Sequence, residues 1–223
     1  MKKMVREDRS LKKLENFLEY GNDIEIGDEL FKKLMFMYSV AIREIENKTS
    51  ILKDEFKELY DYELINHIDT RIKEPESILR KMKKRQMNFT YKEMIENVND
   101  IAGIRIVCPL KKDIFSIEKL IKKIPGVNLL KEKDYITYPK ESGYSSYHMI
   151  VEVPVTLSKS VIYMKVEIQI RTLAMDFWAN MEHRVKYKPN EKFETLNNKE
   201  SKEWINCAKL INKMENKMML LNS

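Results

Sequence analysis

The chain has 223 residues, of which 43% are hydrophobic and 34% are charged, with only five Gly and six Pro. This composition is typical of a folded, helix-rich protein, and it excludes collagen-like, low-complexity and disordered classes. At about 100–200 residues per domain, the length excludes two full catalytic units. The formal net charge is +6. If it is clustered, such a charge marks a site for a polyanion, either nucleotide phosphates or nucleic acid.

Cysteine usage and hydropathy indicate the compartment. Cys108 and Cys207 lie far apart, and no Cys-x-x-Cys pair occurs, so we expect reduced thiols and not a disulfide framework. The N-terminus is positively charged, but no apolar stretch follows it. No segment approaches the roughly 18–20 apolar residues of a membrane span. These features predict a cytoplasmic protein that does not contact a membrane.

The first part of the chain is predicted to be helical over residues 11–60. A short apolar stripe begins at Leu11, and four later apolar residues repeat at the spacing of one helix face: Leu34, Tyr38, Ala41 and Ile45. We interpret these helices as packing elements. A further helix is expected over residues 75–88, because Pro75 suits the first helical position.

Three segments have the pattern of strands. Residues 101–107 are mostly apolar and β-branched, which is typical of a buried strand, and a helix is expected over residues 113–124. Residues 147–155 and 161–172 alternate between apolar and polar side chains, as half-buried strands do. The polar face of the last segment holds Tyr163, Lys165, Glu167, Gln169 and Arg171. An ordinary solvent-exposed face would look similar, so the alternation alone does not indicate a site.

Two further helices are predicted near the C-terminus. The first spans about residues 173–186, and we expect its Phe177 and Trp178 to lie in the core. After a polar loop around Pro189 and Asn190, the second helix carries an apolar seam: Cys207, Ile211, Met214, Met218 and Leu221. Such a seam serves either packing within the chain or oligomerisation. The order of elements predicts an α+β fold with a mixed β-sheet and helical flanks.

Most of the excess positive charge lies in one short segment. Residues 71–85 hold seven basic and two acidic residues, a net charge of +5. Ser77 and Lys81 share one helix face there, and Ser77 lies in the first turn, where backbone N–H groups favour an anion. Arg71 and Lys73 precede the helix and could bind the same phosphates. A solvent-exposed basic face or a nucleic-acid patch would have the same charge pattern.

The usual glycine-rich phosphate loops are missing from the sequence, as are His and Cys at metal-ligand spacing. A nucleotide would therefore be bound by side chains and a divalent cation. Mg²⁺ takes oxygen ligands, usually one or two carboxylates plus substrate phosphates. Asp100, just before a buried strand, and Glu167, on the polar face of a later strand, are the candidates. Taken singly, each is more often a turn former or an exposed residue.

Four separated motifs give these carboxylates a context. They are Asp100–Arg105 (DIAGIR), Gly143–His148 (GYSSYH), Glu167–Thr172 (EIQIRT) and Ala174–Ala179 (AMDFWA). With these motifs in this order, the chain resembles the synthetase domain of the RelA/SpoT superfamily, most closely its single-domain small alarmone synthetases. The resemblance implies a nucleotidyltransferase-like core over residues 67–188 with a mixed sheet of about five strands. Residues 1–66 would form a helical extension, and residues 189–223 would hold the C-terminal helix.

The resemblance also implies an activity. The family transfers the β,γ-pyrophosphate of ATP to the ribose 3′-hydroxyl of GDP or GTP, which makes the alarmones ppGpp and pppGpp of the stringent response and releases AMP. Mg²⁺ would be held by Asp100 and Glu167, and Glu167 would help to deprotonate the 3′-hydroxyl. Five residues would bind ATP: Arg71 and Arg105, which sandwich adenine, and Lys73, Ser77 and Lys81 at the phosphates. Four would bind GDP or GTP: Tyr144 on the guanine ring, His148, Lys140 and Asp176.

The residue at position 176 bears on which base the acceptor site selects. Selecting guanine requires an acceptor that faces N1–H and the 2-amino group, and a carboxylate supplies two acceptor oxygens. Related enzymes often carry an asparagine at this place, so the aspartate departs from the pattern. We interpret Asp176 as a guanine reader, with a charge at the helix N-terminus as the alternative.

Other functions stay open at this level. Toxic relatives modify the 3′ end of tRNA or make adenosine alarmones, and the basic residues 80–85 are compatible with RNA binding, although the activity does not require it. A non-catalytic RNA-binding module is disfavoured because it would not need paired carboxylates. The chain has no His-Asp dipeptide, so we expect synthesis without hydrolysis. We also expect a homo-oligomer, a tetramer, and no chemical role for His67 or His183.

Overall fold

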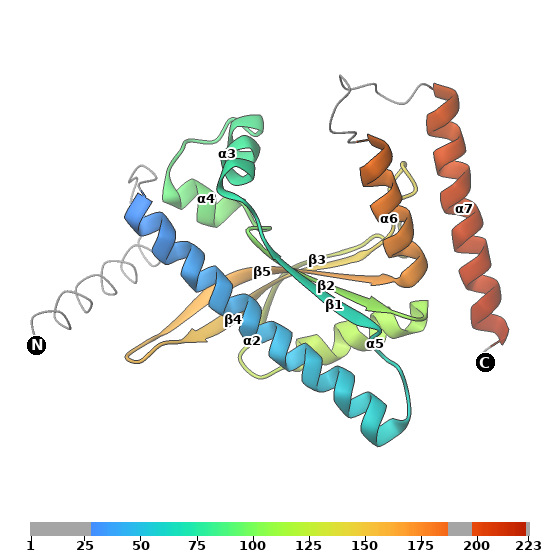
Figure 1. Cartoon of the computed structure of the whole chain (residues 1–223), viewed down its shortest axis with the longest axis horizontal. Coiled ribbons are helices and arrows are strands. Elements are labelled where there is room, and N and C mark those ends of the chain that lie inside the picture. The colour runs from blue at the N-terminus through green and yellow to red at the C-terminus, as the bar shows by residue number, and fades with distance from the viewer. Residues whose placement is uncertain (1–27, 187–197, 222–223) are drawn as a thin grey trace, which may run out of the picture.

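The computed structural model describes residues 28–186 and 198–221, which form one five-stranded mixed sheet with helices around it (Figure 1). The strands are β1 (His67–Ile72), β2 (Ala102–Cys108), β3 (Asn128–Asp134), β4 (Tyr147–Thr156) and β5 (Val161–Thr172). The helices are α2 (Asp28–Tyr60), α3 (Pro75–Lys84), α4 (Tyr91–Asn97), α5 (Lys111–Lys122), α6 (Leu173–Lys186) and α7 (Asn198–Leu221). The predicted α+β fold with a mixed sheet is confirmed.

The strands lie in the order β1-β2-β5-β4-β3, with β2 and β5 parallel and the other pairs antiparallel. The three strands that the sequence predicted are the three interior ones. The two edge strands were not recognised from the pattern, because an edge strand that faces solvent shows no apolar alternation. In β3 no residue is buried, and the pairing register shifts between Leu129 and Lys131, which marks a β-bulge.

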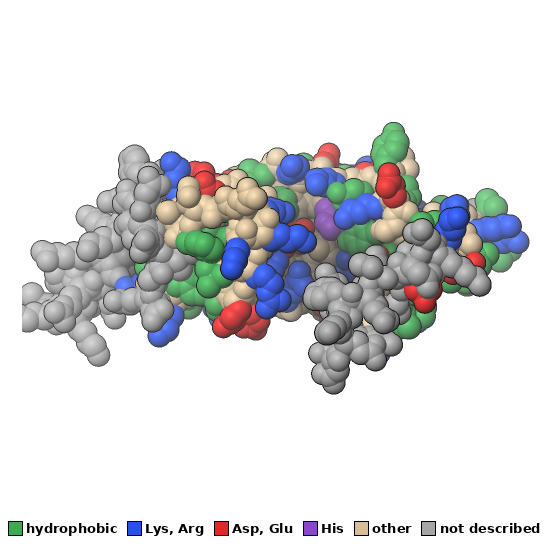
Figure 2. Space-filling view, turned by 90° about the horizontal axis from the view of Figure 1, so that it is seen from above, with side chains coloured by type: hydrophobic (Ala, Val, Ile, Leu, Met, Phe, Trp, Pro, Cys, Tyr) green, Lys and Arg blue, Asp and Glu red, His purple; other side chains and the backbone are tan. Residues whose placement is uncertain are grey.

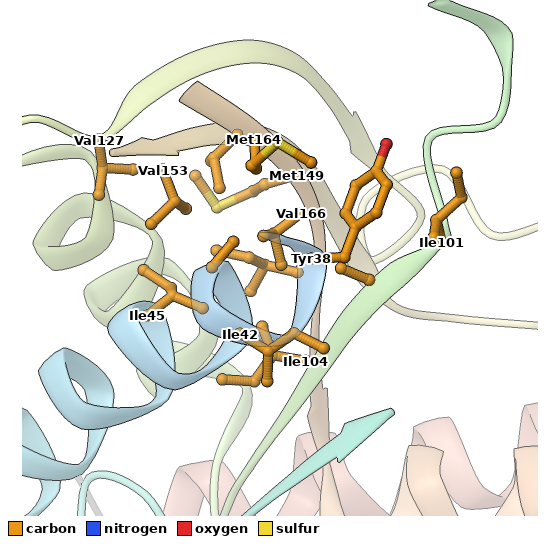
Figure 3. Packing of buried hydrophobic residues seen from close by; sticks show 14 of the residues in the cluster. Tyr38, Ile42, Ile45, Ile101, Ile104, Val127, Met149, Val153, Met164 and Val166 are labelled. Atoms are coloured by element: carbon orange, nitrogen blue, oxygen red, sulfur yellow. The ribbon is translucent and has the colours of Figure 1, made fainter. Parts of the chain in front are cut away.

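One face of the sheet is apolar and packs against α2 and α5. The α2 residues predicted to share a helix face are all buried: Leu34, Tyr38, Ala41 and Ile45. Figure 3 shows Tyr38 and Ile42 of α2 among sheet residues that include Ile104 and Val166. Because side chains alternate across a strand, burying this face turns the residues in between towards the other side of the sheet, where the polar groups gather.

The helix predicted over residues 75–88 ends early, and a second short helix follows it. α3 ends at Lys84, before the predicted residue 88, because Gln86 adopts a left-handed φ of 55° that a helix cannot continue. α4 then begins after Thr90, whose side chain accepts a hydrogen bond from the backbone N–H of Glu93 (3.3 Å) and so caps the helix. Ile78 and Met82 anchor α3 in the main core. The basic side chains are therefore left on its outer side.

The C-terminal helices lie side by side at one end of the sheet (Figure 1). Trp178 of α6 is buried as predicted, but the prediction for Phe177 is wrong: it is 62% exposed, because it lies on the outer side of the helix. α7 packs through three residues: Trp204 contacts Trp178 of α6, Ala208 lies against Gly143 on the loop before β4, and Glu215 accepts a hydrogen bond from Thr172 at the end of β5. Most of the predicted seam lies on another face and is exposed: Cys207, Met214, Met218 and Leu221.

Some expectations fall on residues outside the described ranges, namely the stripe that begins at Leu11 and the loop around Pro189 and Asn190. The side chain of His183 is also outside them. Among the described residues, no helix is both long and apolar enough to cross a membrane.

Candidate active site

The face of the sheet opposite α2 carries two polar rows that cross all five strands. Following the strand register from β1 to β3, one row contains Arg71, Gly103, Glu167, Ile150 and Lys131. The next row contains Asp69, Arg105, Gln169, His148 and Lys133. Figure 2 shows Lys and Arg side chains gathered around a hollow in which a histidine is visible. Residues that are far apart in the sequence thus line one surface.

A first cavity of about 190 Å³ opens over β1, β2 and β5. Its walls include Arg71 and Arg105, and its floor includes Gly103. Arg71 pairs directly with Gly103, so Arg105 is its diagonal cross-strand neighbour, at a typical separation of about 7–8 Å. That separation leaves room for one flat ring between two guanidinium planes. A side chain larger than glycine at position 103 would grow into this space, since its Cβ would already contact Arg71 Cγ at 3.7 Å.

A second cavity, of about 320 Å³, adjoins the first. It is lined by the basic residues Lys81, Arg85, Lys131, Lys133 and Lys140, together with Asp100, Tyr135 and His148. Glu167 borders both cavities. This carboxylate therefore lies where a group bound in one cavity would meet a group bound in the other.

Asp100 is held between two lysines at the wall of the second cavity. Lys73 donates to its Oδ2 (2.5 Å), and Lys81 of α3 donates to its Oδ1 (2.6 Å). The backbone fixes this arrangement, because the N–H of Lys73 donates to the carbonyl oxygen of Ile101 (2.8 Å), next to Asp100. Burial acts to raise the pKa of Asp100, but the hydrogen bonds and charges of the two lysines hold it below its usual value. Asp100 is therefore ionised at neutral pH.

Glu167 is surrounded by hydrogen-bond donors. Gln169 donates to its Oε2 (2.9 Å), and His148 Nδ1 lies 3.4 Å from its Oε1. Burial acts to raise the pKa of Glu167, and the charge of Asp100 acts in the same direction, but His148 and Gln169 hold it below its usual value. Asp100 and Glu167 both line the second cavity.

Tyr144 lies at the edge of this site, on the loop before β4. Arg171 Nη2 donates to the Tyr144 hydroxyl (2.8 Å), which lies 2.8 Å from His148 Nε2. Because the hydroxyl accepts from Arg171, it can donate to His148, which leaves Nδ1–H to donate to Glu167. The Lys140 ammonium lies 4.7 Å from the centre of the Tyr144 ring. Tyr144, His148 and Glu167 therefore form one connected chain of hydrogen bonds.

The loop depends on Gly143. This residue has a φ of +87°, in the left-handed region that favours glycine. A Cβ at this position would lie 2.4 Å from the Cβ of Ala208 on α7. Both the turn and the close approach of α7 therefore require glycine.

Asp176 lies deeper than the other candidates, at the start of α6. Its Oδ1 is 3.2 Å from Arg105 Nη1 and 3.2 Å from Arg171 Nη1, and its Oδ2 accepts from Asn180 Nδ2 (2.8 Å). Its role as a guanine reader stays a prediction, as do the roles of the other site residues. Most of them line the two cavities: Arg71, Lys81, Asp100, Arg105, Lys140, His148 and Glu167. Lys73, Tyr144 and Asp176 contact lining residues, whereas Ser77 is placed only on α3, four residues before Lys81.

Three residues at the site were not singled out from the sequence. Arg171 and Gln169 lie on the polar face of β5 and within the motif Glu167–Thr172, but no role was assigned to them there, and no pattern separates a buried arginine from an exposed one. Tyr135 follows β3 and contacts the rings of Tyr144 and His148 edge-on at 6.1 and 5.4 Å. No motif of the sequence marked it.

The carboxylate pair fits a magnesium ion that also binds phosphate. Within the described residues, no group of three or more His, Cys, Asp or Glu side chains could hold a metal by itself. Mg²⁺ commonly binds one or two carboxylates and completes its six oxygen ligands with water and substrate phosphates. Asp100 and Glu167, with lysines beside them, match that donor set.

Comparison with known proteins places this site in context. A family model described as "Region found in RelA / SpoT proteins" matches residues 70–192. The GTP pyrophosphokinase YwaC of Bacillus subtilis is 37% identical over 198 residues, which cover 89% of this chain and 93% of that protein. The GTP pyrophosphokinase YjbM of the same organism is 34% identical over 163 residues, covering 73% and 76%.

Solved structures agree with the sequence comparison. The crystal structure of small alarmone synthetase 1 from Bacillus subtilis bound to its product pppGpp has a TM-score of 0.78 at 29% identity, covering 87% of this chain and 97% of that one. Small alarmone synthetase 2 from the same organism has a TM-score of 0.77 at 34% identity, covering 87% and 98%. The fold and nearly the whole length are shared.

Proposed function

Because the chain belongs to the RelA/SpoT family, we propose that it is a GTP pyrophosphokinase, a small alarmone synthetase of the stringent response. It transfers the β,γ-pyrophosphate of ATP to the 3′-hydroxyl of GDP or GTP, forms ppGpp or pppGpp, and releases AMP. The observation that carries this proposal is the position of Glu167 on the border of two adjoining cavities. A reaction between two nucleotides needs such a shared boundary.

The donor nucleotide occupies the first cavity and the wall of the second. Arg71 and Arg105 stack on the two faces of adenine, since a planar guanidinium stacks on a ring better than an ammonium does. Lys73, Ser77 and Lys81 bind the phosphates. The two lysines pair with Asp100 in this structure, and their flexible stems let them turn to phosphate oxygens.

The acceptor nucleotide lies on the other side of Glu167. Tyr144 stacks on guanine, with the Lys140 ammonium leaving the ring face that it covers here. Lys140 then binds the acceptor phosphates, and His148 lies on the side of the ribose. Stacking on a tyrosine supplies binding energy at low entropic cost, because the side chain has only two torsions to fix.

The reaction proceeds by positioning and by charge stabilisation. The 3′-oxygen attacks the β-phosphorus, the bond from that phosphorus to the bridging oxygen of the α-phosphate breaks, and AMP leaves with the electron pair. The hydroxyl proton passes to Glu167. Asp100 and Glu167 would hold Mg²⁺, which, when bound, neutralises part of the phosphate charge that repels the nucleophile.

One experiment tests the activity and the acceptor together. The purified protein is incubated with γ-labelled ATP and Mg²⁺, with GDP, GTP, ADP or tRNA offered in turn. We expect label only in the guanosine nucleotides, and none with the Glu167→Gln variant. Label in ADP or at the tRNA 3′ end would overturn the guanosine acceptor, and no label in any arm would overturn the enzyme and favour a non-catalytic RNA-binding module.

We further propose that the protein acts in the cytoplasm as a homotetramer. Support comes from α7, where Leu210, Met214 and Met218 are 66%, 48% and 54% exposed, and apolar surface of this kind commonly mediates association. Sedimentation velocity at several concentrations measures the assembly. A monomer at every concentration would contradict the tetramer.

A further inference from the structure

A buried carboxylate connects the two halves of the site. Asp176 places one oxygen, Oδ1, 3.2 Å from Nη1 of both Arg105 and Arg171. The exposed fractions of the Asp176 and Arg171 side chains are only 11% and 6%, whereas Arg105 reaches the first cavity at 27%. One oxygen thus contacts two guanidinium groups, one of which lines the first cavity while the other donates to the Tyr144 hydroxyl.

The first arginine leads to the donor side. Arg105 lines the first cavity together with Arg71. Its Nε is buried and finds no hydrogen-bond partner among the described residues. Its other carboxylate contact, Asp69, is 3.9 Å away and largely exposed. Asp176 is therefore the main group that fixes the plane of the Arg105 guanidinium.

The second arginine leads to the acceptor side. Arg171 Nη2 donates to the Tyr144 hydroxyl and to Gln169 Oε1, both at 2.8 Å, and its guanidinium lies 5.3 Å from the centre of the Tyr144 ring. Within the described part of the chain, Arg171 Nε also lacks a partner. The orientation of Arg171, and through it that of Tyr144, thus depends on the bonds made by its two Nη atoms.

These contacts leave Asp176 poorly placed to read a base directly. A carboxylate offers about four acceptor positions. Arg171 and Asn180 use two of them through hydrogen bonds, and the Arg105 guanidinium forms an ion pair with Oδ1 at 3.2 Å. Guanine presents two adjacent donors, N1–H and the 2-amino group. Both donors would compete with these partners for the carboxylate oxygens, and a displaced Arg171 would lose its carboxylate partner in a buried position.

We propose that Asp176 is a positioning residue that sets the adenine-stacking Arg105 and the guanine-stacking Tyr144 at the same time. This proposal rests on the proposed function, because it takes the donor and acceptor sides from it. Loss of the Asp176 charge then weakens the binding of both nucleotides together. A guanine reader, by contrast, would affect only the acceptor.

The test uses the Asp176→Asn variant and measures binding of each nucleotide by itself. Calorimetric titration with a non-hydrolysable ATP analogue and, separately, with GDP gives two dissociation constants without turnover, so it remains informative if the protein proves not to make alarmones. We expect both constants to rise by about tenfold, the loss expected for one charge-assisted contact on each side. A rise for GDP alone, with the ATP analogue within about twofold of wild type, would overturn the proposal.

Further variants separate positioning from a general loss of structure. Asn180→Ala removes the Asp176 partner that contacts neither the donor side nor the acceptor side of the site. It should leave both dissociation constants unchanged. Tyr144→Phe removes the hydroxyl contact and should weaken GDP only. Asp176→Glu retains the charge and should restore part of the affinity for both ligands, and thermal melts of every variant identify any that do not fold. If Asp176→Asn is unfolded, a failure of Asp176→Glu to bind either ligand while still folded would count against positioning.

A last comparison addresses base reading itself. IDP differs from GDP by lacking the 2-amino group, so the ratio of their affinities measures how strongly that group is read. We expect Asp176→Asn to leave this ratio unchanged. A ratio that falls to about one in the variant would overturn the proposal and establish direct reading of guanine by Asp176.

Discussion

Two aspartates of this site each contact two cationic side chains, but the cations differ in kind. Asp100 lies at a cavity wall between two lysines, whereas Asp176 lies beneath the surface between two arginines. An ammonium on a flexible stem can change partners, but a guanidinium presents a planar fork whose contacts are fixed by geometry. The first cluster is suited to rearrange when phosphates arrive, and the second to keep its shape.

The largest expected effect concerns catalysis at the first aspartate. Asp100→Asn should lower kcat by about 10³-fold, because charge is lost where it stabilises the transition state. Glu167→Gln should have a similar effect. Steady-state rates and circular dichroism are the measurements, with Glu152→Gln on the same face of β4 as the control. A kcat within tenfold of wild type for Asp100→Asn would contradict the assignment of a catalytic role to Asp100 as opposed to Asp176.

The next effect concerns the free energy of unfolding. Here the substitution at Asp176 should have the larger effect and the substitution at Asp100 the smaller one. Asp176→Asn should lower the free energy of unfolding by about 3 kcal/mol, because it leaves buried arginine charge without its partner. Asp100→Asn should lower it by about 1 kcal/mol or less, since lysines at a cavity wall can turn to water. Urea denaturation of both variants measures the difference. Equal losses would mean that Asp100 is as much a part of the framework as Asp176.

A smaller effect shows which nucleotide the Tyr144 side of the site serves. Tyr144→Ala should raise the KM for GDP or GTP by at least about tenfold, which is the loss expected for one base–aromatic stack. The KM for ATP should stay the same, because the adenine cavity is lined by other residues. Kinetics with each substrate varied in turn provide the check, and an unchanged acceptor KM would argue against stacking.

The smallest predicted effect tests whether position 171 requires the planar guanidinium of arginine and not only a positive charge. Arg171→Lys keeps the charge but cannot reach Asp176, Tyr144 and Gln169 together, so the acceptor KM should rise about fivefold. Lys165→Arg, the reverse exchange on the same strand, serves as the control, because Lys165 only donates to carbonyl oxygens of α4. If Arg171→Lys has the same acceptor KM as wild type, the guanidinium geometry of Arg171 does not fix the position of Tyr144.

Sequence reasoning succeeded where a residue's neighbours in the chain determine its environment. The apolar stripe of α2 and the alternation in β4 and β5 are local patterns, and they predicted which side chains are buried. β1 and β3 are strands because of partners far away in the sequence, and α3 ends early because of one backbone torsion at Gln86. Neither cause leaves a periodic signal.

The same distinction applies to the site. Motifs indicated Asp100, Glu167 and Tyr144, because each lies in a recognisable segment. Arg171 lies in the same EIQIRT segment as Glu167, but nothing in that segment separates it from an exposed arginine on the polar face of the strand, and the fold buries it. What Asp176 contacts was likewise hidden, since its two arginines come from different strands. Composition cannot reveal which of several arginines shares an oxygen.

The alternation of side chains in this sheet determines which of its strands can tolerate an inserted or deleted residue. Glu167 and Gln169 face the site while Ile168 and Ile170 face the core, so one inserted or deleted residue in β5 would exchange the two sets. β3 has no buried side chain and its register already shifts between Leu129 and Lys131, so an inserted residue at that shift would not disturb the core, although Lys131 and Lys133 after it line the second cavity. Insertions and deletions should therefore accumulate in β3 and be rejected in β5, even though the two strands belong to one sheet.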